Sequence, residues 1–276
     1  MLGANPLTNM HHQTQKDTPY AQSSSVSAEE IAHFSTLAKD WWDPNGPMRL
    51  LHAMNPVRIA WAMRYLPLPE ISPPQQPTRR ARILDIGCGA GIASESLAQE
   101  GYDVLGLDAS AEGIAAAQAH LAKTQNPAKT QNLNKPFAHD LITLHYRCGN
   151  IEDLVHEKQC FDAIVAFELI EHVTNPEQFM ILLAQLVQPG GTLIISTLNR
   201  TYRSLIIAKI AAEYLFNLVP TGTHEWRKFI QPAELGHYAR KAGFSLTAIT
   251  GFSALSGTWK ESSNLRINYA AAFKKL

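Results

Sequence analysis

Residues 83–91 read Ile83-Leu84-Asp85-Ile86-Gly87-Cys88-Gly89-Ala90-Gly91, and they are more informative about this chain than any other stretch. An apolar pair leads into Asp85, a glycine-rich turn follows, and residues 92–98 have a helical composition. This order of strand, tight loop and helix is typical of the opening of a nucleotide-binding βαβ unit. Glycines adopt backbone conformations that other residues avoid, and they let a ligand approach the main chain closely. The spacing is G-x-G-x-G, and position 92, where a dinucleotide fingerprint has its third glycine, is Ile.

A second acidic residue follows the glycine turn. Residues 104–108, Val-Leu-Gly-Leu-Asp, predict a second strand that ends in Asp108, whose carboxylate suits a ribose diol. The acidic residue before the loop and the compressed glycines resemble motif I of the class I S-adenosylmethionine (SAM) methyltransferases. A glycine turn beside an ordinary surface aspartate is the alternative, and it has to explain both features at once. The sequence therefore predicts a SAM site.

Composition limits the classes of protein that fit. The 276 residues are enough for one large domain, and the formal charge of zero gives no electrostatic support for a nucleic-acid partner. The three cysteines are an odd number without metal-ligand spacing, which indicates reduced thiols in a cytoplasmic protein. No apolar run reaches the roughly 18 residues that span a bilayer. The first 48 residues contain no Arg and no apolar core, which argues against a transit or signal peptide.

Alternating strands and helices from residue 83 onward predict an α/β fold with a doubly wound, mostly parallel sheet. Residues 1–26 are polar and are expected to be a disordered tail, and residues 27–276 are expected to form one domain with a helical extension at its start. Residues 122–140 contain a short polar duplication and predict a loop insertion. Further strands are expected at residues 142–146, 161–166, 192–196, 244–250 and 267–273, with a Pro-Gly-Gly turn at 189–191.

Several motifs, taken in order, resemble the ubiquinone-biosynthesis O-methyltransferases over about residues 27–273. They are Trp41-Trp42-Asp43, Leu51-His52, Asn55-Pro56 with Arg58, the glycine loop, residues 168–173, residues 196–200 and Gly222-Thr223-His224. The resemblance implies a seven-stranded sheet with a reversed last strand. It also implies SAM-dependent methylation of catechol-type hydroxyls, at two steps, on a ring that carries a polyprenyl tail. The tail and the 122–140 insertion lie outside the pattern.

The resemblance also implies roles for particular residues. Gly87 would line the SAM pocket, Asp108 would hold the ribose hydroxyls, and Arg58 would pair with the methionine carboxylate. Without the resemblance, an exposed helix arginine is the plainer interpretation of Arg58. Phe167 stands where relatives have a Met against the cofactor, and Asn150 stands where many have an Asp near the adenine. The predicted cofactor-binding residues are Arg58, Asp85, Gly87, Gly89, Gly91, Asp108, Asn150 and Phe167.

Three polar residues follow the predicted fourth strand, and they are the catalytic candidates. A neutral phenol, with a pKa of about 10, is a poor nucleophile that needs a base or a Lewis acid. If the segment is helical, Glu168, Glu171 and His172 share a face and could hold a divalent ion against both catechol oxygens. The resemblance implies Mg²⁺. The alternatives are His172 as a general base tuned by Glu171, or a helix start with Glu at its positive end.

Residues 204–219 predict an amphipathic helix within a lid or membrane-contact segment at 200–226. Lys209, Glu213 and Asn217 recur every four residues and leave a broad apolar face. One interpretation is a lid packed on the core. The other is an interfacial helix that reaches a lipid-held substrate, with Arg200 and Arg203 meeting anionic headgroups. The second interpretation predicts peripheral association with the inner face of the cell membrane.

Two other functions stay open at this point. One is a SAM-dependent methyltransferase for another small phenol or for a quinone-ring carbon. The other is a non-catalytic SAM-fold scaffold, whose expected mark is a damaged cofactor loop, and this loop is intact. Other enzymes of quinone biosynthesis are further expected partners.

Overall fold

The computed structural model describes residues 25, 31–32, 35, 38–71, 78–124, 143–201, 204, 226–255 and 258–276. The helices are η1 (Ala38–Asp40), α2 (Arg49–Met63), α3 (Ile92–Gln99), α4 (Ala111–Thr124), α5 (Ile151–His156), η4 (Ile170–His172), α6 (Pro176–Leu186) and α9 (Pro232–Lys241). The strands are β1 (Glu70–Ile71), β2 (Arg79–Arg80), β3 (Arg82–Ile86), β4 (Asp103–Asp108), β5 (Thr143–Cys148), β6 (Phe161–Phe167), β7 (Val187–Leu198), β8 (Phe244–Leu255), β9 (Thr258–Ser262) and β10 (Asn268–Lys275).

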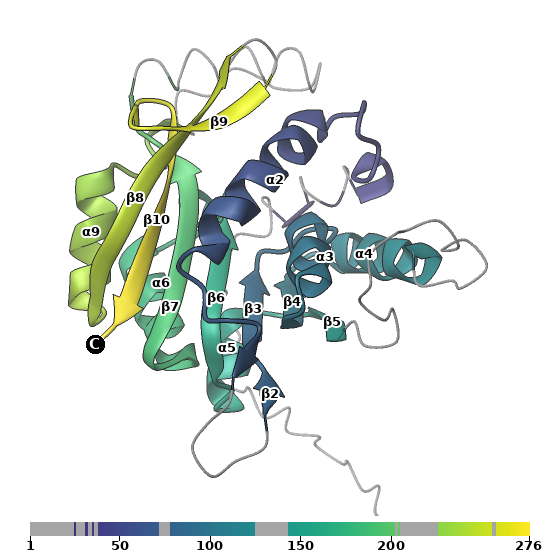
Figure 1. The fold of residues 1–276 in the computed structure, drawn as a ribbon, viewed down its shortest axis with the longest axis horizontal. Helices are drawn as coiled ribbons and strands as arrows, with labels where there is room; N and C mark the ends of the chain where they lie inside the picture. The colour runs from purple at the N-terminus through teal and green to yellow at the C-terminus, as the bar shows by residue number, and fades with distance from the viewer. Residues whose placement is uncertain are drawn as a thin grey trace, which may run out of the picture.

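Eight strands form one sheet in the order β5-β4-β3-β6-β7-β10-β8-β9 (Figure 1). The pairs from β5 to β7 are parallel, whereas β10 runs antiparallel to both β7 and β8. This confirms the predicted mostly parallel α/β fold with a reversed last strand. The expected count of seven strands is wrong by one. The reason is that β8 continues past Thr250 to Leu255 and pairs with a further antiparallel strand, β9.

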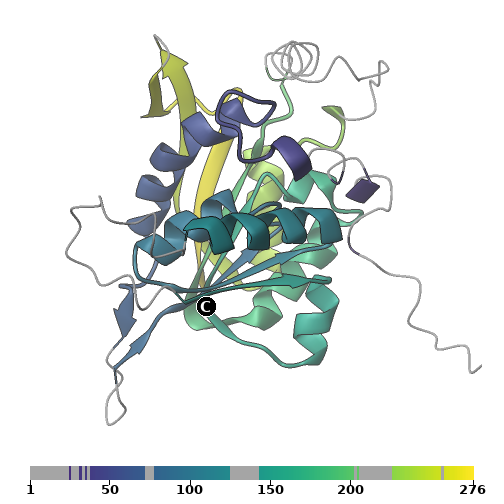
Figure 2. The same cartoon turned by 90° about the vertical axis from the view of Figure 1, so that its right-hand side faces the viewer.

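Both faces of the sheet are covered by helices. Helices α2, α3 and α4 lie over one face, and α5, α6 and α9 lie over the other (Figures 1 and 2). Successive residues of a strand point to opposite faces, so in β3 Ile83 packs in the core beside α2 and α3. Its neighbour Leu84 packs in the core beside α5, α6 and α9. A central strand with two buried faces must be apolar on both, which explains the run Ala-Ile-Val-Ala-Phe at 163–167.

The strand order reverses beside β3, with β4 and β5 on one side and β6 and β7 on the other. In open α/β sheets, ligands bind outside the carboxyl ends of the strands at such a point. The glycine loop begins where β3 ends, and Asp108 is the last residue of β4. Both predicted cofactor features therefore meet at this edge.

The predicted turn at 189–191 lies within the span of β7. The pairing of β7 with β6 passes from Val187 opposite Phe161 to Thr192 opposite Ala163, so the residues between them bulge out of the ladder. The predicted fifth strand is therefore longer than expected at both ends.

Several predictions fall on residues outside the described part of the chain. They are nearly all of the tail at 1–26, most of the helix expected after Ser27, most of the insertion and most of the segment at 200–226. Where the insertion was expected to begin, α4 runs to Thr124, so residues 122–124 are helical and not loop. Among the described residues, no helix combines the length and apolar character needed to cross a membrane.

Candidate active site

A cavity opens at the carboxyl edge of the sheet, and most of the predicted site residues line it. Those that line it are Arg58, Asp85, Gly87, Gly89, Asp108, Asn150, Phe167, Glu168 and His172. Gly91 and Glu171 are not among the lining residues. We call residues 85–91 with Asp108 the cofactor edge, and residues 168–172 the acid–base segment.

The three glycines of the loop all have positive φ, at 71° for Gly87, 53° for Gly89 and 89° for Gly91. A Cβ on Gly87 would lie 2.8 Å from the side chain of Leu169, and one on Gly91 would lie 2.1 Å from the Tyr146 hydroxyl. Non-glycine residues are therefore excluded by both conformation and space. Gly91 precedes α3 and packs against Tyr146, and its cofactor contact stays a prediction.

Asp108 is held by the main chain at the rim of the cavity. Its carboxylate accepts bonds from the backbone N–H of Gly89 and of Ser110, each at 2.8 Å. Burial raises the pKa of Asp108, and these backbone bonds oppose the rise. Each carboxylate oxygen keeps a further lone pair, so the group can still accept bonds from two adjacent hydroxyls.

Asp85 is more buried than Asp108, and it ties the end of β3 to α3. Its carboxylate is buried and accepts a 2.5 Å bond from the hydroxyl of Ser94 on α3. Burial raises the pKa of Asp85 to about 6, although the bond from Ser94 and the charge of Arg58 oppose the rise. Asn150 lies on the other side of the cavity, just before α5, where its backbone N–H donates to Asp153 at 2.9 Å.

Arg58 reaches the cavity from α2 and is almost fully buried, with 2% of its side chain exposed. The interpretation as an exposed helix arginine is therefore wrong. Its guanidinium lies 4.2 Å above the centre of the Phe167 ring, and Nη2 donates to the Asn55 side chain at 3.2 Å. Phe167 thus does more than the expected apolar contact, because its ring also supports the cation.

The remaining nitrogens of Arg58 are not satisfied by the protein. Nε and Nη1 are buried without a hydrogen-bond partner, and Nη1 is 3.8 Å from Glu168 Oε1. Burial lowers the pKa of Arg58, and the charges of Glu168 and Asp85 oppose that effect. A buried guanidinium with unsatisfied donors favours an anionic partner, and the predicted partner is the methionine carboxylate of SAM.

The backbone of the acid–base segment is not the α-helix that the sequence predicts. Glu168 follows β6 with a φ of 50°, and only residues 170–172 form a short 3₁₀ turn. The expected α-helical face shared by Glu168, Glu171 and His172 is therefore wrong. Within the ranges that the structure describes, no group of three or more His, Cys, Asp or Glu side chains is arranged to hold a metal ion.

Strand β7 holds the two carboxylates of this segment. The hydroxyl of Ser196 donates to Glu168 at 2.7 Å, and that of Thr197 donates to Glu171 at 2.7 Å. Glu171 is buried, and burial raises its pKa, as does the charge of Glu168, whereas His172 lowers it. Glu168 and His172 line the cavity, whereas Glu171 is buried and does not line it.

Sequence reasoning assigned no site role to several lining residues, among them Trp41, Met48 and Leu51 from the extension before the glycine loop. Trp41 is pressed against the glycine loop, since a Cβ on Gly89 would lie 2.4 Å from its ring. In the sequence, Trp41 and Trp42 are recognisable only as part of a family motif. The position of Trp41 beside a glycine with no room for a side chain could not be inferred without the tertiary contact.

Comparisons with known proteins agree with this geometry. A family model described as "Methyltransferase domain" matches residues 62–249. The chain is 38% identical over 258 residues to a ubiquinone biosynthesis O-methyltransferase of Coxiella burnetii (strain CbuK_Q154), which covers 93% of this chain and 98% of that protein. It is 36% identical over 250 residues to the protein of that name from Azorhizobium caulinodans, covering 89% and 92%.

Solved structures share the fold. The magnesium protoporphyrin IX methyltransferase ChlM from Synechocystis PCC 6803, with bound SAH, matches with a TM-score of 0.59 at 18% identity, over 89% of this chain and 95% of that one. A SAM-dependent methyltransferase from Thermotoga maritima matches with a TM-score of 0.59 at 17% identity, over 90% and 99%. With its cofactor edge intact and its similarity to named relatives running nearly end to end, this chain belongs to the ubiquinone biosynthesis O-methyltransferase family of SAM-dependent methyltransferases.

Proposed function

We propose that this enzyme transfers the SAM methyl group to catechol-type hydroxyls of polyprenylated ring intermediates in ubiquinone biosynthesis, at both O-methylation steps. One observation carries the proposal. Arg58, which suits the methionine end of SAM, lies 3.8 Å from Glu168, the first residue of the acid–base segment. His172, the proposed general base, lines the same cavity as these two residues, so the methyl donor and the group that takes the acceptor's proton would share it.

The cofactor edge binds and orients SAM in this proposal. Arg58 pairs with the methionine carboxylate and Asp108 accepts bonds from the ribose hydroxyls, while Asn150 lies toward the adenine. With the donor held in a fixed position, the reaction requires only that the acceptor oxygen is placed in line with the methyl carbon and the sulfur.

His172 removes the proton. The phenolic oxygen attacks the methyl carbon, the carbon–sulfur bond breaks, and S-adenosylhomocysteine (SAH) leaves with the electron pair on sulfur. The hydroxyl proton passes to His172 as general base. Glu171 stands behind His172, and its carboxylate favours the charged imidazolium that forms.

The family resemblance also implies that the enzyme uses Mg²⁺, held by Glu168, Glu171 and His172. The donor chemistry suits a divalent cation, which would relieve the repulsion by which Glu168 raises the pKa of Glu171. The side chains as placed do not fit a three-ligand site, since Glu171 is bonded to Thr197 and lies outside the cavity lining. No step above depends on the ion.

The Mg²⁺ hypothesis is tested by titrating the ion into chelator-treated protein by calorimetry. Binding that is lost in Glu171→Gln, together with turnover that returns when Mg²⁺ is added, supports the site. Full turnover in chelator with no heat of binding rejects it.

A further part of the proposal concerns location. A polyprenyl tail partitions into lipid, so the enzyme meets its substrate at the inner face of the cell membrane. The amphipathic pattern of the sequence at 204–219 supports this, and Arg200, Arg203 and Lys209 would add attraction to anionic lipid. Ile207→Glu with Leu218→Glu should reduce binding to anionic vesicles. Turnover of a prenylated substrate should fall more than turnover of a soluble catechol.

The proposed reaction is tested by quinone profiling of a deletion strain by mass spectrometry. Accumulation of a demethylated catechol, cured by the wild-type gene and not by Asp108→Ala, is the expected result. Cure by Asp108→Ala would favour a scaffold, and a missing ring-carbon methyl would favour the alternative enzyme.

A further inference from the structure

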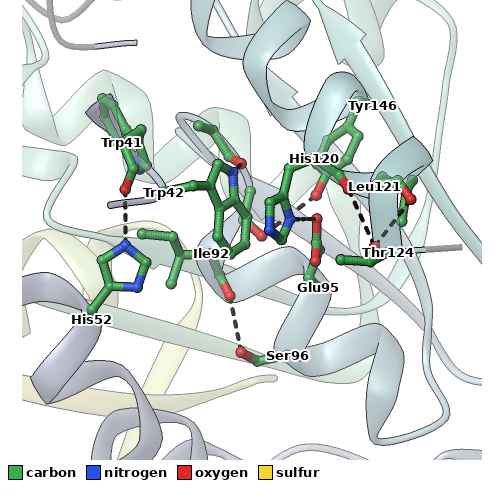
Figure 3. Close-up of polar contacts among 12 residues, drawn as sticks. Trp41, Trp42, His52, Ile92, Glu95, Ser96, His120, Leu121, Thr124 and Tyr146 are labelled. Atoms are coloured by element: carbon green, nitrogen blue, oxygen red, sulfur yellow. Dashed lines mark hydrogen bonds and ion pairs between the residues drawn. The ribbon is translucent and has the colours of Figure 1, made fainter. Parts of the chain in front are cut away.

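Three side chains from separate parts of the chain form a stacked contact beside the cofactor edge. The Trp42 indole, just before α2, lies flat on the His120 imidazole of α4, with ring centroids 3.4 Å apart and an interplanar angle of 5°. Nδ1 of His120 lies 2.8 Å from the carboxylate of Glu95 on α3. Figure 3 shows the three in a row, and we call them the Trp42 latch.

The latch is tied directly to the glycine loop. Nε1 of Trp42 donates to the carbonyl of Ala90 at 2.9 Å. On the other side, Nε2 of His52 lies 2.8 Å from the carbonyl of Trp41, to which it donates (Figure 3). The peptide that joins Trp41 to Trp42 is therefore fixed on both sides.

The latch holds Trp41, which forms part of the wall of the SAM cavity. Trp41 lines the cavity and is in contact with Gly89, whereas Trp42, His120 and Glu95 do not line it. These three residues can therefore act on SAM only through neighbours such as Trp41, Ala90 and Ile92.

The Glu95–His120 contact is built into the fold and is not a loose surface pair. The Glu95 side chain is only 6% exposed, and burial raises its pKa while the bond to His120 opposes the rise. A buried carboxylate needs a partner, so it fixes the orientation of the imidazole on which Trp42 stacks.

We infer that the Trp42 latch positions Trp41 against bound SAM, which makes His120 a positioning residue for the cofactor. The inference rests on SAM binding and is independent of the methyl acceptor. Because Trp41 lines the cavity, we expect the latch also to slow dissociation of SAH.

The test compares SAH binding and steady-state kinetics in latch variants. His120→Ala removes both the stack and the bond to Glu95, and it should raise the Kd for SAH by about tenfold. The KM for SAM should rise with it, kcat should stay unchanged, and SAH should dissociate faster in stopped-flow measurements. His120→Gln, whose amide can still donate to Glu95, should recover part of the affinity.

A matched control and a second variant keep the test decisive. Gln118→Ala, exposed on α4 and outside the latch, should leave the Kd for SAH unchanged. If His120→Ala does not fold, Trp42→Phe carries the same expectation, because it keeps a ring and loses the bond to Ala90. Unchanged SAH affinity in folded latch variants, or a fall in kcat at constant KM, overturns the inference.

Discussion

The cofactor edge and the acid–base segment lie in one cavity but are held in place by different forces. In the cofactor edge, backbone N–H groups fix Asp108, and the loop glycines occupy positions where no side chain fits. In the acid–base segment, the carboxylates depend on hydroxyls of β7 that come 28 and 26 residues later in the chain. The first region is held by main-chain groups of two neighbouring loops, whereas the second is held by side-chain hydroxyls of another strand. Substitutions should therefore separate cofactor affinity from chemistry.

The largest effect is expected in the acid–base segment. His172→Gln should lower kcat by about 10²–10⁴-fold, because it removes the general base for a weakly acidic phenol. The measurement is steady-state turnover of a soluble catechol at saturating SAM. His145→Gln, an exposed histidine on β5, is the control and should keep wild-type turnover. If His172→Gln keeps a third or more of its activity, proton removal belongs to another group.

The next effect concerns stability at the cofactor edge. Burial raises the pKa of Asp85 from 3.8 to about 6, so the unfolded chain loses this proton at lower pH than the folded protein. The free energy of unfolding should therefore fall as pH rises through this window, by up to about 3 kcal/mol. In Asp85→Asn this part of the pH dependence should vanish. Urea unfolding of the SAM-free protein from pH 4 to 7 measures it, and equal slopes in both proteins would contradict the assignment.

Removing the charge of Arg58 should weaken SAH binding by about 30-fold, because a charge-assisted contact is lost. Arg58→Met keeps most of the apolar volume, and isothermal titration gives the affinity. Arg64→Met, beyond the end of the same helix and paired at the surface with Glu261, should bind SAH normally. Equal affinities in the two variants would remove Arg58 from the SAM site.

The smallest effect tests the ring below Arg58. Phe167→Leu should weaken SAH binding by about threefold to tenfold through loss of the cation–π contact. Strand β6 supplies its own control, because Arg82 lies 5.0 Å above the ring of Phe161 at the opposite end of the strand. Phe161→Leu should lower stability without changing SAH affinity. Identical losses of affinity in both would mean that Phe167 acts only through packing.

The same contrast explains what could be predicted from the sequence. Asp85, the glycine spacing and Asp108 belong to a continuous strand-loop-helix-strand pattern, so the sheet and the cofactor edge were predictable from local periodicity. The turn at Ile170–His172 was not, because the left-handed conformation of Glu168 and the bonds from Ser196 and Thr197 are tertiary features. Strand β9 was missed for a similar reason: its sequence is short and polar, and only pairing with β8 makes it a strand.

The separation of binding from chemistry is tested most directly by titrating SAH calorimetrically into Asp108→Ala and His172→Gln side by side. Asp108→Ala should lose at least about tenfold in affinity, because its carboxylate is proposed to accept bonds from the ribose hydroxyls, whereas His172→Gln should bind as the wild type does. Similar affinities in the two variants, whether both weakened or both intact, would contradict the account of one cavity with a cofactor edge and a distinct acid–base segment.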